Sequence, residues 1–320
     1  MELITRTAPV VFDGDFNVDP NNIPPYLVGG MLAGIDEAIN GETETKTFSE
    51  ALQSVEDLER FKSEVRAQNE ADIEAALESA KVAALREKCH KLSFLVITTA
   101  QDAVMLPRML ASLPRRVEIC IVLNEKSDAD EFTVDGEYTE DDRIVRIATW
   151  KYKQFSFAKA RNYSIELASY EWCIWIDSDD VLLTHQHPDI LKIPNVERGI
   201  GGIEFGCVGY HSPIESMDGG EYYAAAHLRA FRKSDGVRFR GFVHEQLRPQ
   251  IEAQKMGILR SQLMVVHLGY CASENLLRSK IERNLSLLKM QCAVDREFLP
   301  NYYEHMLAKT ITTYHELKGI

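Results

Sequence analysis

An apolar run that ends in three carboxylates lies near the middle of the chain. It reads Trp172-Cys-Ile-Trp-Ile-Asp177-Ser-Asp179-Asp180. A run of this length and composition predicts a buried strand with the acidic residues at its C-terminal end. In open α/β sheets ligands bind outside the carboxyl ends of the strands, and paired carboxylates suit a hard divalent cation and the diphosphate that it carries. The alternative is a solvated acidic turn that binds nothing.

The size and composition are those of a globular protein. The 320 residues allow one large α/β domain with an appendage or two smaller domains, and 45% of them are apolar and 27% charged. The net charge of −13 is uneven, because residues 1–90 carry 18 acids and 8 bases and the remaining 230 residues carry 31 and 28. Nucleic acid is an unfavoured partner, since tracking phosphates requires clustered Lys and Arg; a local basic groove is the remaining alternative.

The cysteines and the N-terminus bear on the cellular compartment. Six scattered cysteines show no Cys-x-x-Cys spacing, which favours reduced core thiols over a disulfide framework. The N-terminus lacks the basic-then-apolar order of a signal peptide. No stretch approaches the roughly 20 apolar residues that span a bilayer. We therefore expect a cytoplasmic protein without a membrane span.

The pattern divides the chain into three parts. Residues 1–90 predict an acidic arm and a long helix, which begins at the capping box Thr47-x-x-Glu50. This helix either docks on the main domain or pairs with another copy to form a homo-oligomer. Residues 91–272 predict the main domain, which contains the acidic run, and residues 273–320 predict a C-terminal helical segment.

Strands and helices are expected to alternate in the second part. This order predicts an α/β fold with a mostly parallel, doubly wound sheet. The expected strands are 92–100, 117–123, 144–149, 171–176, 203–210 and 222–231, and the expected helices are 105–112, 158–168, 274–292 and 301–317.

Four motifs follow one another between residues 92 and 300. They are the strand end Ile97-Thr98-Thr99; Phe155-Ser-Phe-Ala-Lys-Ala-Arg161-Asn162 with Asp177-Ser178-Asp179 fifteen residues later; Phe239-Arg-Gly241-Phe-Val-His244-Glu245; and Val266-His267-Leu-Gly269-Tyr270 followed by Lys280-x-Glu-Arg283-Asn284. In this order they resemble the family-2 glycosyltransferases, which have the Rossmann-like GT-A nucleotide-sugar transferase fold. The last motif is typical of members that continue into tetratricopeptide-like helices. Residues 1–90 lie outside the resemblance.

The resemblance implies a metal-dependent, inverting transferase. It would move a hexose from a nucleoside-diphosphate sugar, expected to be a UDP-sugar, to a peptide, protein or surface-glycan acceptor. Asp179 is expected to coordinate the metal directly, Asp177 to contact the ribose or reach the metal through water, and His267 to add a ligand from a late strand. An imidazole among carboxylates favours Mn²⁺ over Mg²⁺. Ser178 belongs to the same motif, and Asp180 is expected to orient the other carboxylates or the sugar.

The donor is expected to contact five further residues. Thr98 and Thr99 end the first strand and are placed to hydrogen-bond the nucleoside, although both are also ordinary strand residues. Asn124 stands where the family usually carries an Asp that contacts the base. Arg161 and Asn162 line the helix before the acidic strand, where the guanidinium would bind a phosphate or hold the acidic cluster in place.

The acceptor must lose a proton as it attacks the anomeric carbon. Glu245 is the expected general base, with His244 beside it as its orienter or substitute. If these two residues lay in an extended strand, their side chains would point to opposite sides.

Three alternatives differ in substrate or in class. A nucleotidyltransferase on the same fold would open with a Gly-rich loop, whereas Thr98-Thr-Ala-Gln-Asp102 has no glycine. A transferase acting on modified nucleobases would need a more basic surface. A non-catalytic carbohydrate-binding or scaffold protein would not need both the acidic cluster and the Val243-His-Glu245 motif.

Overall fold

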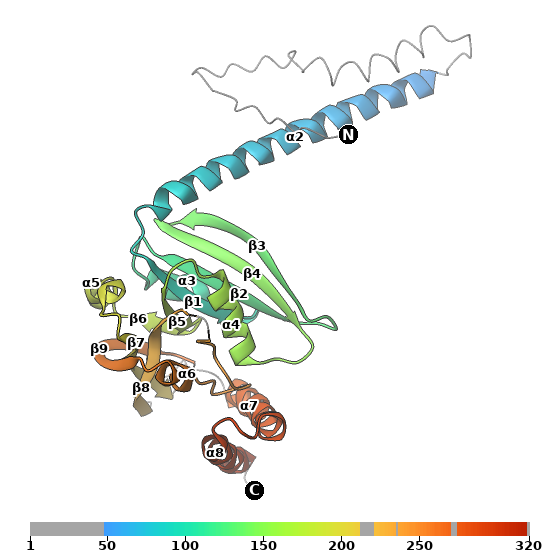
Figure 1. Ribbon diagram of the computed structural model, residues 1–320. Coiled ribbons are helices and arrows are strands. Elements are labelled where there is room, and N and C mark those ends of the chain that lie inside the picture. Colours follow the sequence, from blue (N-terminus) through green and yellow to red (C-terminus); the bar gives the residue numbers. More distant parts are fainter. Residues whose placement is uncertain (1–47, 212–220, 235, 270–273, 319–320) are drawn as a thin grey trace, which may run out of the picture. The chain divides into compact units, whose positions relative to one another are not determined.

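The computed structural model describes residues 48–211, 221–234, 236–269 and 274–318 (Figure 1). The chain divides into two compact units, residues 1–69 and 70–320. Helix α2 (Phe48–Arg86) begins in the first unit and ends in the second. The long N-terminal helix expected from the sequence is therefore present. The expected acidic arm and Thr47 of the capping box lie outside the described residues.

The second unit contains a nine-stranded sheet with the order β3-β4-β2-β1-β5-β8-β7-β9-β6. Four adjacent strands in it are parallel, and all four were expected from the sequence. They are β4 (Arg143–Tyr152), β2 (Glu118–Lys126), β1 (Leu92–Thr98) and β5 (Trp172–Asp177).

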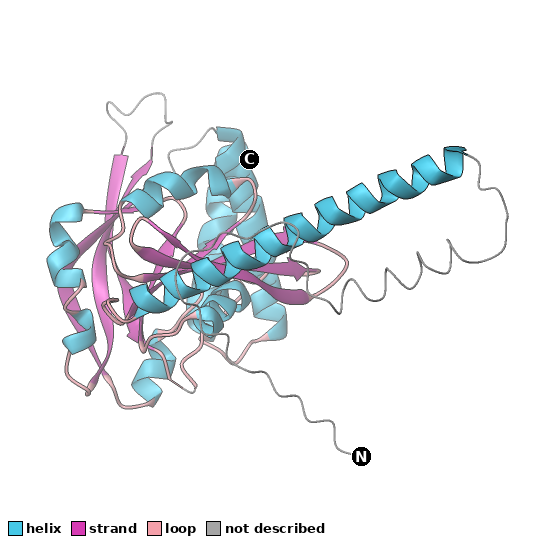
Figure 2. Ribbon diagram, turned by 90° about the horizontal axis from the view of Figure 1, so that it is seen from above, coloured by secondary structure: helices cyan, strands magenta, loops and turns pink. Residues whose placement is uncertain are grey.

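Both faces of the parallel strands are covered (Figure 2). Phe94 and Ile119 pack with Met109 of α3 (Leu106–Ala111) on one side. Residues of the other side, such as Leu95, Val122 and Trp150, pack with Ala160 and Ile165 of α4 (Phe157–Leu167). Strands buried on both faces are read as unbroken apolar runs, which is the pattern that these segments show. The predicted fold class, an α/β Rossmann-like sheet with helices before and after it, is confirmed.

The other half of the sheet is mixed. Strand β8 (Glu221–Arg232) is antiparallel to both β5 and β7 (Ile200–His211), and β7 is parallel to β9 (Gly257–His267). The three-residue strand β6 (Asp180–Leu182) is antiparallel to β9. The hydrophobic pattern predicted β7 and β8 but not β6, and β9 was expected only through the resemblance, which implied a late strand that carries His267.

An exposed edge strand was also missed. Strand β3 (Glu131–Glu140) is antiparallel to β4 at the end of the sheet, and most of its side chains are exposed. The segment is acidic and contains a glycine, so it shows no alternation of apolar and polar residues. Such an alternation arises only where at least one face of a strand is buried.

Short helical segments connect these strands, and two long helices follow them. The short ones are η1 (Asp102–Met105), η2 (Thr184–Gln186), α5 (His187–Ile190), η3 (Ile193–Asn195) and α6 (Arg248–Ala253).

Helices α7 (Glu274–Val294) and α8 (Pro300–Lys318) pack on each other through a cluster that includes Leu288 and Tyr303. The expected C-terminal helices are therefore present, and their continuation into a tetratricopeptide-like array stays a prediction. Among the helices of the described residues, none is long and apolar enough to cross a membrane.

The C-terminal turns of α2 dock on the sheet. Val82 and Leu85 are buried against Ile144 of β4 and Tyr170. The neighbouring apolar stripe of the same helix is different, because Ile73 and Leu77 are 61% and 59% exposed. The helix thus docks on the sheet through one face of its last turns.

The cysteines that the structure describes form no disulfide. Four of them, Cys89, Cys120, Cys173 and Cys207, are buried, and Cys292 is half-buried. Burial raises the pKa of the Cys173 thiol to about 12, so this side chain stays a neutral core group. Cys271 lies outside the described residues.

Candidate active site

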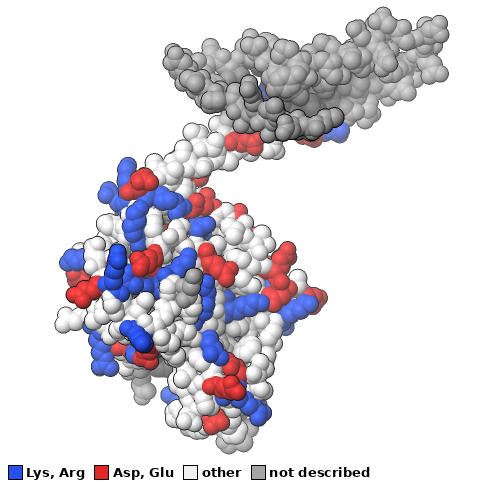
Figure 3. All heavy atoms as spheres, in the orientation of Figure 1, with Lys and Arg blue, Asp and Glu red and all other residues white. Residues whose placement is uncertain are grey.

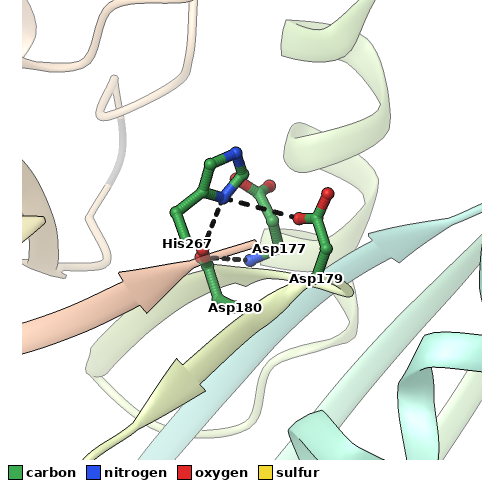
Figure 4. Close-up of side chains that lie close together, drawn as sticks. All are labelled: Asp177, Asp179, Asp180 and His267. Atoms are coloured by element: carbon green, nitrogen blue, oxygen red, sulfur yellow. Dashed lines mark hydrogen bonds and ion pairs between the residues drawn. The ribbon is translucent and has the colours of Figure 1, made fainter. Parts of the chain in front are cut away.

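The acidic residues form a tight turn between β5 and β6. Asp177 is the last residue of β5, Asp180 is the first of β6, and the Asp177 backbone N–H donates to Asp180 Oδ2 over 2.8 Å. The pairing of β6 with β9 places His267 directly opposite Asp180. The imidazole Nδ1 lies 2.8 Å from Asp180 Oδ1 and 3.6 Å from Asp179 Oδ1 (Figure 4). Ligand atoms of all four side chains lie within 4.8 Å of one another.

This group of side chains has the composition of a divalent cation site. Three carboxylates and one imidazole offer oxygen and nitrogen ligands. His267 Nδ1 contacts the Asp180 carboxylate, as the histidine ligands of metal sites frequently contact a carboxylate through one ring nitrogen. A Cβ on Gly269 would come within 2.4 Å of His267 Nε2 and 2.5 Å of Asp179 Oδ2. The two ligand atoms therefore converge on a space that only a glycine keeps open.

Two buried arginines balance the negative charge. Arg161 of α4 donates to Asp177 Oδ1 over 2.8 Å and also to Glu245 Oε1. Arg229 of β8 donates to Asp180 Oδ2 over 2.7 Å, and its Nη1 lies 3.8 Å from Asp177 Oδ2. Both guanidinium groups lie over the Trp175 ring, at 4.1 Å and 3.7 Å from its centroid. The electron-rich face of the indole stabilises both buried cations, which have little contact with water.

The carboxylates of this turn differ in their electrostatic environment. Burial raises the pKa of the Asp177 carboxyl, but Arg161 and Arg229 outweigh it and hold that pKa below its usual range. Asp179 has no arginine partner: burial and the charges of Asp177 and Asp180 raise its pKa, and His267 and Lys280, at 3.6 Å and 3.8 Å, only partly offset this. Of the two carboxylates, the one with the weaker compensation gains more from a cation.

The expected nucleoside contacts lie along the same edge of the sheet. Asn124 near the end of β2 donates from Nδ2 to the Thr98 carbonyl over 2.8 Å, and its Oδ1 is buried without a hydrogen-bond partner among the described residues. Thr98 is buried, and Thr99 Oγ1 donates to Asp102 Oδ2 over 2.9 Å. Because β1 lies between β2 and β5, these groups adjoin the acidic turn.

The segment that carries the expected base is a turn. Arg240 and Gln246 form an isolated antiparallel bridge, and His244 between them has a φ of 52°. The segment is therefore a turn and not the extended strand considered from the sequence. Strand alternation does not place the side chains of Glu245 and His244 on opposite sides here. A residue with a positive φ closes the loop because the chain must reverse within a few residues.

The helix α4 holds this turn in place. Asn162 donates to the Phe239 carbonyl over 3.0 Å and accepts from the Phe239 N–H over 2.8 Å, so its amide is engaged by the backbone. Its neighbour Arg161 contacts Glu245. Burial lowers the pKa of the His244 imidazole, which keeps this side chain neutral at pH 7.

The structure thus brings most of the expected residues into one place. Asp177, Asp179, Asp180 and His267 form the cluster, and Arg161 connects it to Glu245. Ser178 is buried within the acidic turn. Neither of two clefts elsewhere in the unit is lined by the cluster. One, of about 440 Å³, lies between α5 and β9, and the other, of about 250 Å³, lies at the start of α4.

Sequence reasoning missed Arg229, although a signal was available. It stands in the segment Ala224-Ala-Ala-His-Leu-Arg-Ala-Phe231, which was expected to be a strand. A single charged residue within an apolar strand requires a buried partner of opposite charge. The pairing of β8 with β5 places that partner at the acidic turn.

The model of the family described as "Glycosyl transferase family 2" matches residues 94–193, a segment that holds β2, β4, β5, most of β1 and the acidic turn. The chain is similar to this family over that segment. It is 30% identical over 192 residues to the SPbeta prophage-derived glycosyltransferase SunS of Bacillus subtilis strain 168 and to the glycosyltransferase SunS of Bacillus phage SPbeta. Each alignment covers 57% of this chain and 43% of the relative, so the chain spans less than half of the length of either SunS protein.

Solved structures give a more distant likeness. TarS 1–349 of S. aureus is 11% identical with a TM-score of 0.37, and the match covers 70% of this chain and 72% of that one. The mannosyltransferase PcManGT of Pyrobaculum calidifontis, in complex with GDP-Man and Mn²⁺, is 14% identical with a TM-score of 0.42 and covers 70% of each chain. Both TM-scores are below 0.5, so the description of the fold rests on the strand order itself.

Proposed function

We propose that this family-2 domain is a glycosyltransferase that moves a hexose from a nucleoside-diphosphate sugar to a nucleophilic acceptor with inversion at the anomeric carbon. The observation that carries the proposal is the cluster of Asp177, Asp179, Asp180 and His267 at the carboxyl end of β5. Its position next to β1 and β2 is where α/β sheets bind nucleotides. The similarity of residues 94–193 to the family-2 glycosyltransferases supports the reaction class.

In this proposal a divalent cation is held by Asp179 and His267, with Asp177 as a further ligand directly or through water. Mn²⁺ fits this mixed oxygen and nitrogen set better than Mg²⁺, which prefers oxygen alone. The cation would neutralise charge on the diphosphate as the glycosidic bond breaks. Asp180 orients His267 and is itself compensated by Arg229.

The protein side chains then supply binding and proton transfer. Asn124 Oδ1, which is buried without a partner among the described residues, would accept the N3–H of a uracil, and this favours a UDP-sugar. The acceptor heteroatom forms a bond to the anomeric carbon and the bond to the β-phosphate oxygen breaks, with its electron pair staying on that oxygen. The acceptor proton passes to Glu245, whose carboxylate Arg161 orients, or to His244.

For the acceptor we propose a peptide or protein side chain or a surface glycan, modified in the cytoplasm. An acidic protein is a poor partner for nucleic acid. On the face that Figure 3 shows, basic and acidic side chains are intermixed, which suits a smaller or neutral acceptor better than a phosphate backbone.

The test is donor hydrolysis over a panel of nucleoside-diphosphate sugars, because slow transfer to water requires no known acceptor. We expect metal-dependent release of nucleoside diphosphate from one donor and loss of this activity with a chelator. Asp179→Asn should lower the rate by roughly 100-fold or more, as removal of a group that stabilises transition-state charge does. The matched control is Asp189→Asn, which alters an exposed aspartate of α5 and should behave as wild type.

Two results would decide against the proposal. Release that is independent of metal and unchanged in Asp179→Asn would remove the cluster from the mechanism. No release from any donor, together with no thermal shift from Mn²⁺ plus any nucleoside diphosphate, would favour a non-catalytic protein.

A further inference from the structure

A lysine from the C-terminal helical segment reaches the acidic cluster. Lys280 of α7 donates from Nζ to the Gly269 carbonyl over 2.7 Å, and the same Nζ lies 3.8 Å from Asp179 Oδ2. Its side chain is 26% exposed, whereas those of Arg161 and Arg229 are 4% and 3% exposed. Of these three cations, Lys280 therefore has the most contact with solvent.

Lys280 keeps hydrogen-bonding capacity that its neighbours among the described residues do not use. An ammonium group has three N–H donors, and the Gly269 carbonyl takes one of them. The contact with Asp179 at 3.8 Å is an ion pair beyond hydrogen-bond distance. Arg161 and Arg229, in contrast, donate at short range to carboxylates of the protein. Lys280 can therefore donate to a ligand that enters beside Asp179.

The charge of such a ligand follows from electrostatics. Lys280 and a cation bound at Asp179 would repel each other, since both are positive and share one carboxylate as their neighbour. A group with negative oxygens that lies between Lys280 and the cation would be attracted to both of them. A diphosphate has several such oxygens, so it can contact Lys280 and the cation at the same time.

From this arrangement we propose that Lys280 binds the diphosphate of the donor and stabilises the charge that develops on the leaving phosphate. This inference rests on the proposed function and extends it to the helix that follows the sheet. Gly269 links the two, because its Cα faces the space between His267 and Asp179 and its carbonyl is held by Lys280.

A competing explanation is that Lys280 only holds the Gly269 backbone in place. The two explanations differ in the sign of one effect. If Lys280 binds phosphate, its loss removes a repulsion and leaves the affinity for Mn²⁺ alone unchanged or higher, while the affinity for a nucleoside diphosphate falls. If it only holds Gly269, its loss disorders the metal ligands and lowers both affinities.

The experiment compares wild type with Lys280→Met and Lys280→Arg. Binding of Mn²⁺ alone is measured by electron paramagnetic resonance of the free ion, and binding of UDP, GDP and UMP in saturating Mn²⁺ is measured by calorimetry. We expect Lys280→Met to weaken diphosphate binding about tenfold or more, the scale of one charge-assisted hydrogen bond, and to weaken UMP binding much less. Lys280→Arg should retain most of the diphosphate affinity. Lys289→Met changes an exposed lysine of the same helix and is the matched control.

Three outcomes would overturn the inference. Equal losses of Mn²⁺ and diphosphate affinity in Lys280→Met would assign the lysine to the support of Gly269. Unchanged affinities in that variant would make the contact incidental. If wild type bound no nucleoside diphosphate of the donor panel with Mn²⁺, UDP and GDP included, the proposed function would fail and the inference with it. Melting temperatures of all variants confirm that each compared protein is folded.

Discussion

A buried and a half-buried carboxylate at opposite ends of the parallel strands have very different surroundings. Glu118 begins β2 and is fully buried. Its carboxylate accepts from Ser93 Oγ over 2.5 Å and from the Ser169 backbone N–H over 2.7 Å, and Arg86 Nη1 lies 3.4 Å away. Asp179 follows the end of β5, and the nitrogen atoms beside it, His267 Nδ1 and Lys280 Nζ, lie at 3.6 Å and 3.8 Å.

The difference separates a structural carboxylate from a functional one. The donors around Glu118 replace its lost hydration, so this residue ties the end of α2 to the sheet. Asp179 has other carboxylates as close neighbours and keeps its oxygens directed at the space beside Gly269. Sites that bind ions are often locally unfavourable until the ion is present.

The variant Asp179→Asn tests whether Asp179 differs in role from Glu118. Without metal we expect the melting temperature at pH 8 to equal or exceed that of wild type. The pKa of Asp179 is raised by burial and by Asp177 and Asp180, so ionisation of this group costs stability as pH rises through and above its normal range. In saturating Mn²⁺ wild type should gain about 3 kcal/mol at a concentration 100 times the Kd, and the variant should gain little.

Calorimetric scans with and without Mn²⁺ measure this prediction. A variant that is markedly less stable than wild type without metal, and that still gains stability from Mn²⁺, would place Asp179 with Glu118 among the structural carboxylates.

The second prediction concerns Glu118→Gln and has the opposite character. We expect the free energy of unfolding to fall by about 1–3 kcal/mol. The buried side chain loses its charge, and one of its two hydrogen-bond-accepting oxygens becomes an NH2 group, which donates. Stabilisation by Mn²⁺ should be unchanged, since Glu118 lies at the other end of the strands. Urea unfolding with and without Mn²⁺ measures both quantities.

Glu131→Gln, on the exposed edge strand, is the matched control for Glu118→Gln. If the Glu118 variant lost its response to Mn²⁺ while remaining folded, the two ends of the sheet would be coupled and the separation of roles would be wrong.

The same comparison explains what could be predicted from the sequence. The strand before Asp177 was predictable because burial on both faces leaves a continuous apolar run, and the acids after it stand out. The nearness of His267 to Asp180 depends on the pairing of β6 with β9, 87 residues apart, and no local pattern encodes it. It was expected only from the order of motifs.

The remaining site geometry depended on long-range packing. Arg229 acquires its role through the register of β8 on β5, and β9 alternates too irregularly to be recognised as a strand. An extended conformation was considered for the Glu245 segment, whereas contacts with Asn162 and the bridge between Arg240 and Gln246 fold it into a turn. Tertiary contacts override local propensity at such positions.

A third carboxylate, that of Glu78, should give a smaller change in stability than Asp179 or Glu118. Glu78 of α2 accepts from the Thr139 backbone N–H over 2.5 Å and from Thr139 Oγ1 over 2.6 Å, and these bonds lower its pKa to about 2. A depressed pKa means that the stabilisation is present above about pH 4.3, the usual value for Glu, and is lost as pH falls toward 2. Glu78→Gln should therefore lower the melting temperature slightly at pH 7, and the difference from wild type should shrink as pH falls from about 5 to about 2, through the unfolded-state and then the folded-state pKa.

Glu74→Gln, an exposed neighbour on α2, is the control and should show no difference at any pH. A difference between Glu78→Gln and wild type that stayed constant over this pH range would mean that the hydrogen bonds to Thr139 do not depend on the charge of Glu78. In that case a carboxylate with two donors, such as Glu78 or Glu118, would stabilise the fold through geometry alone, and the contrast with Asp179 would be one of contacts and not of charge.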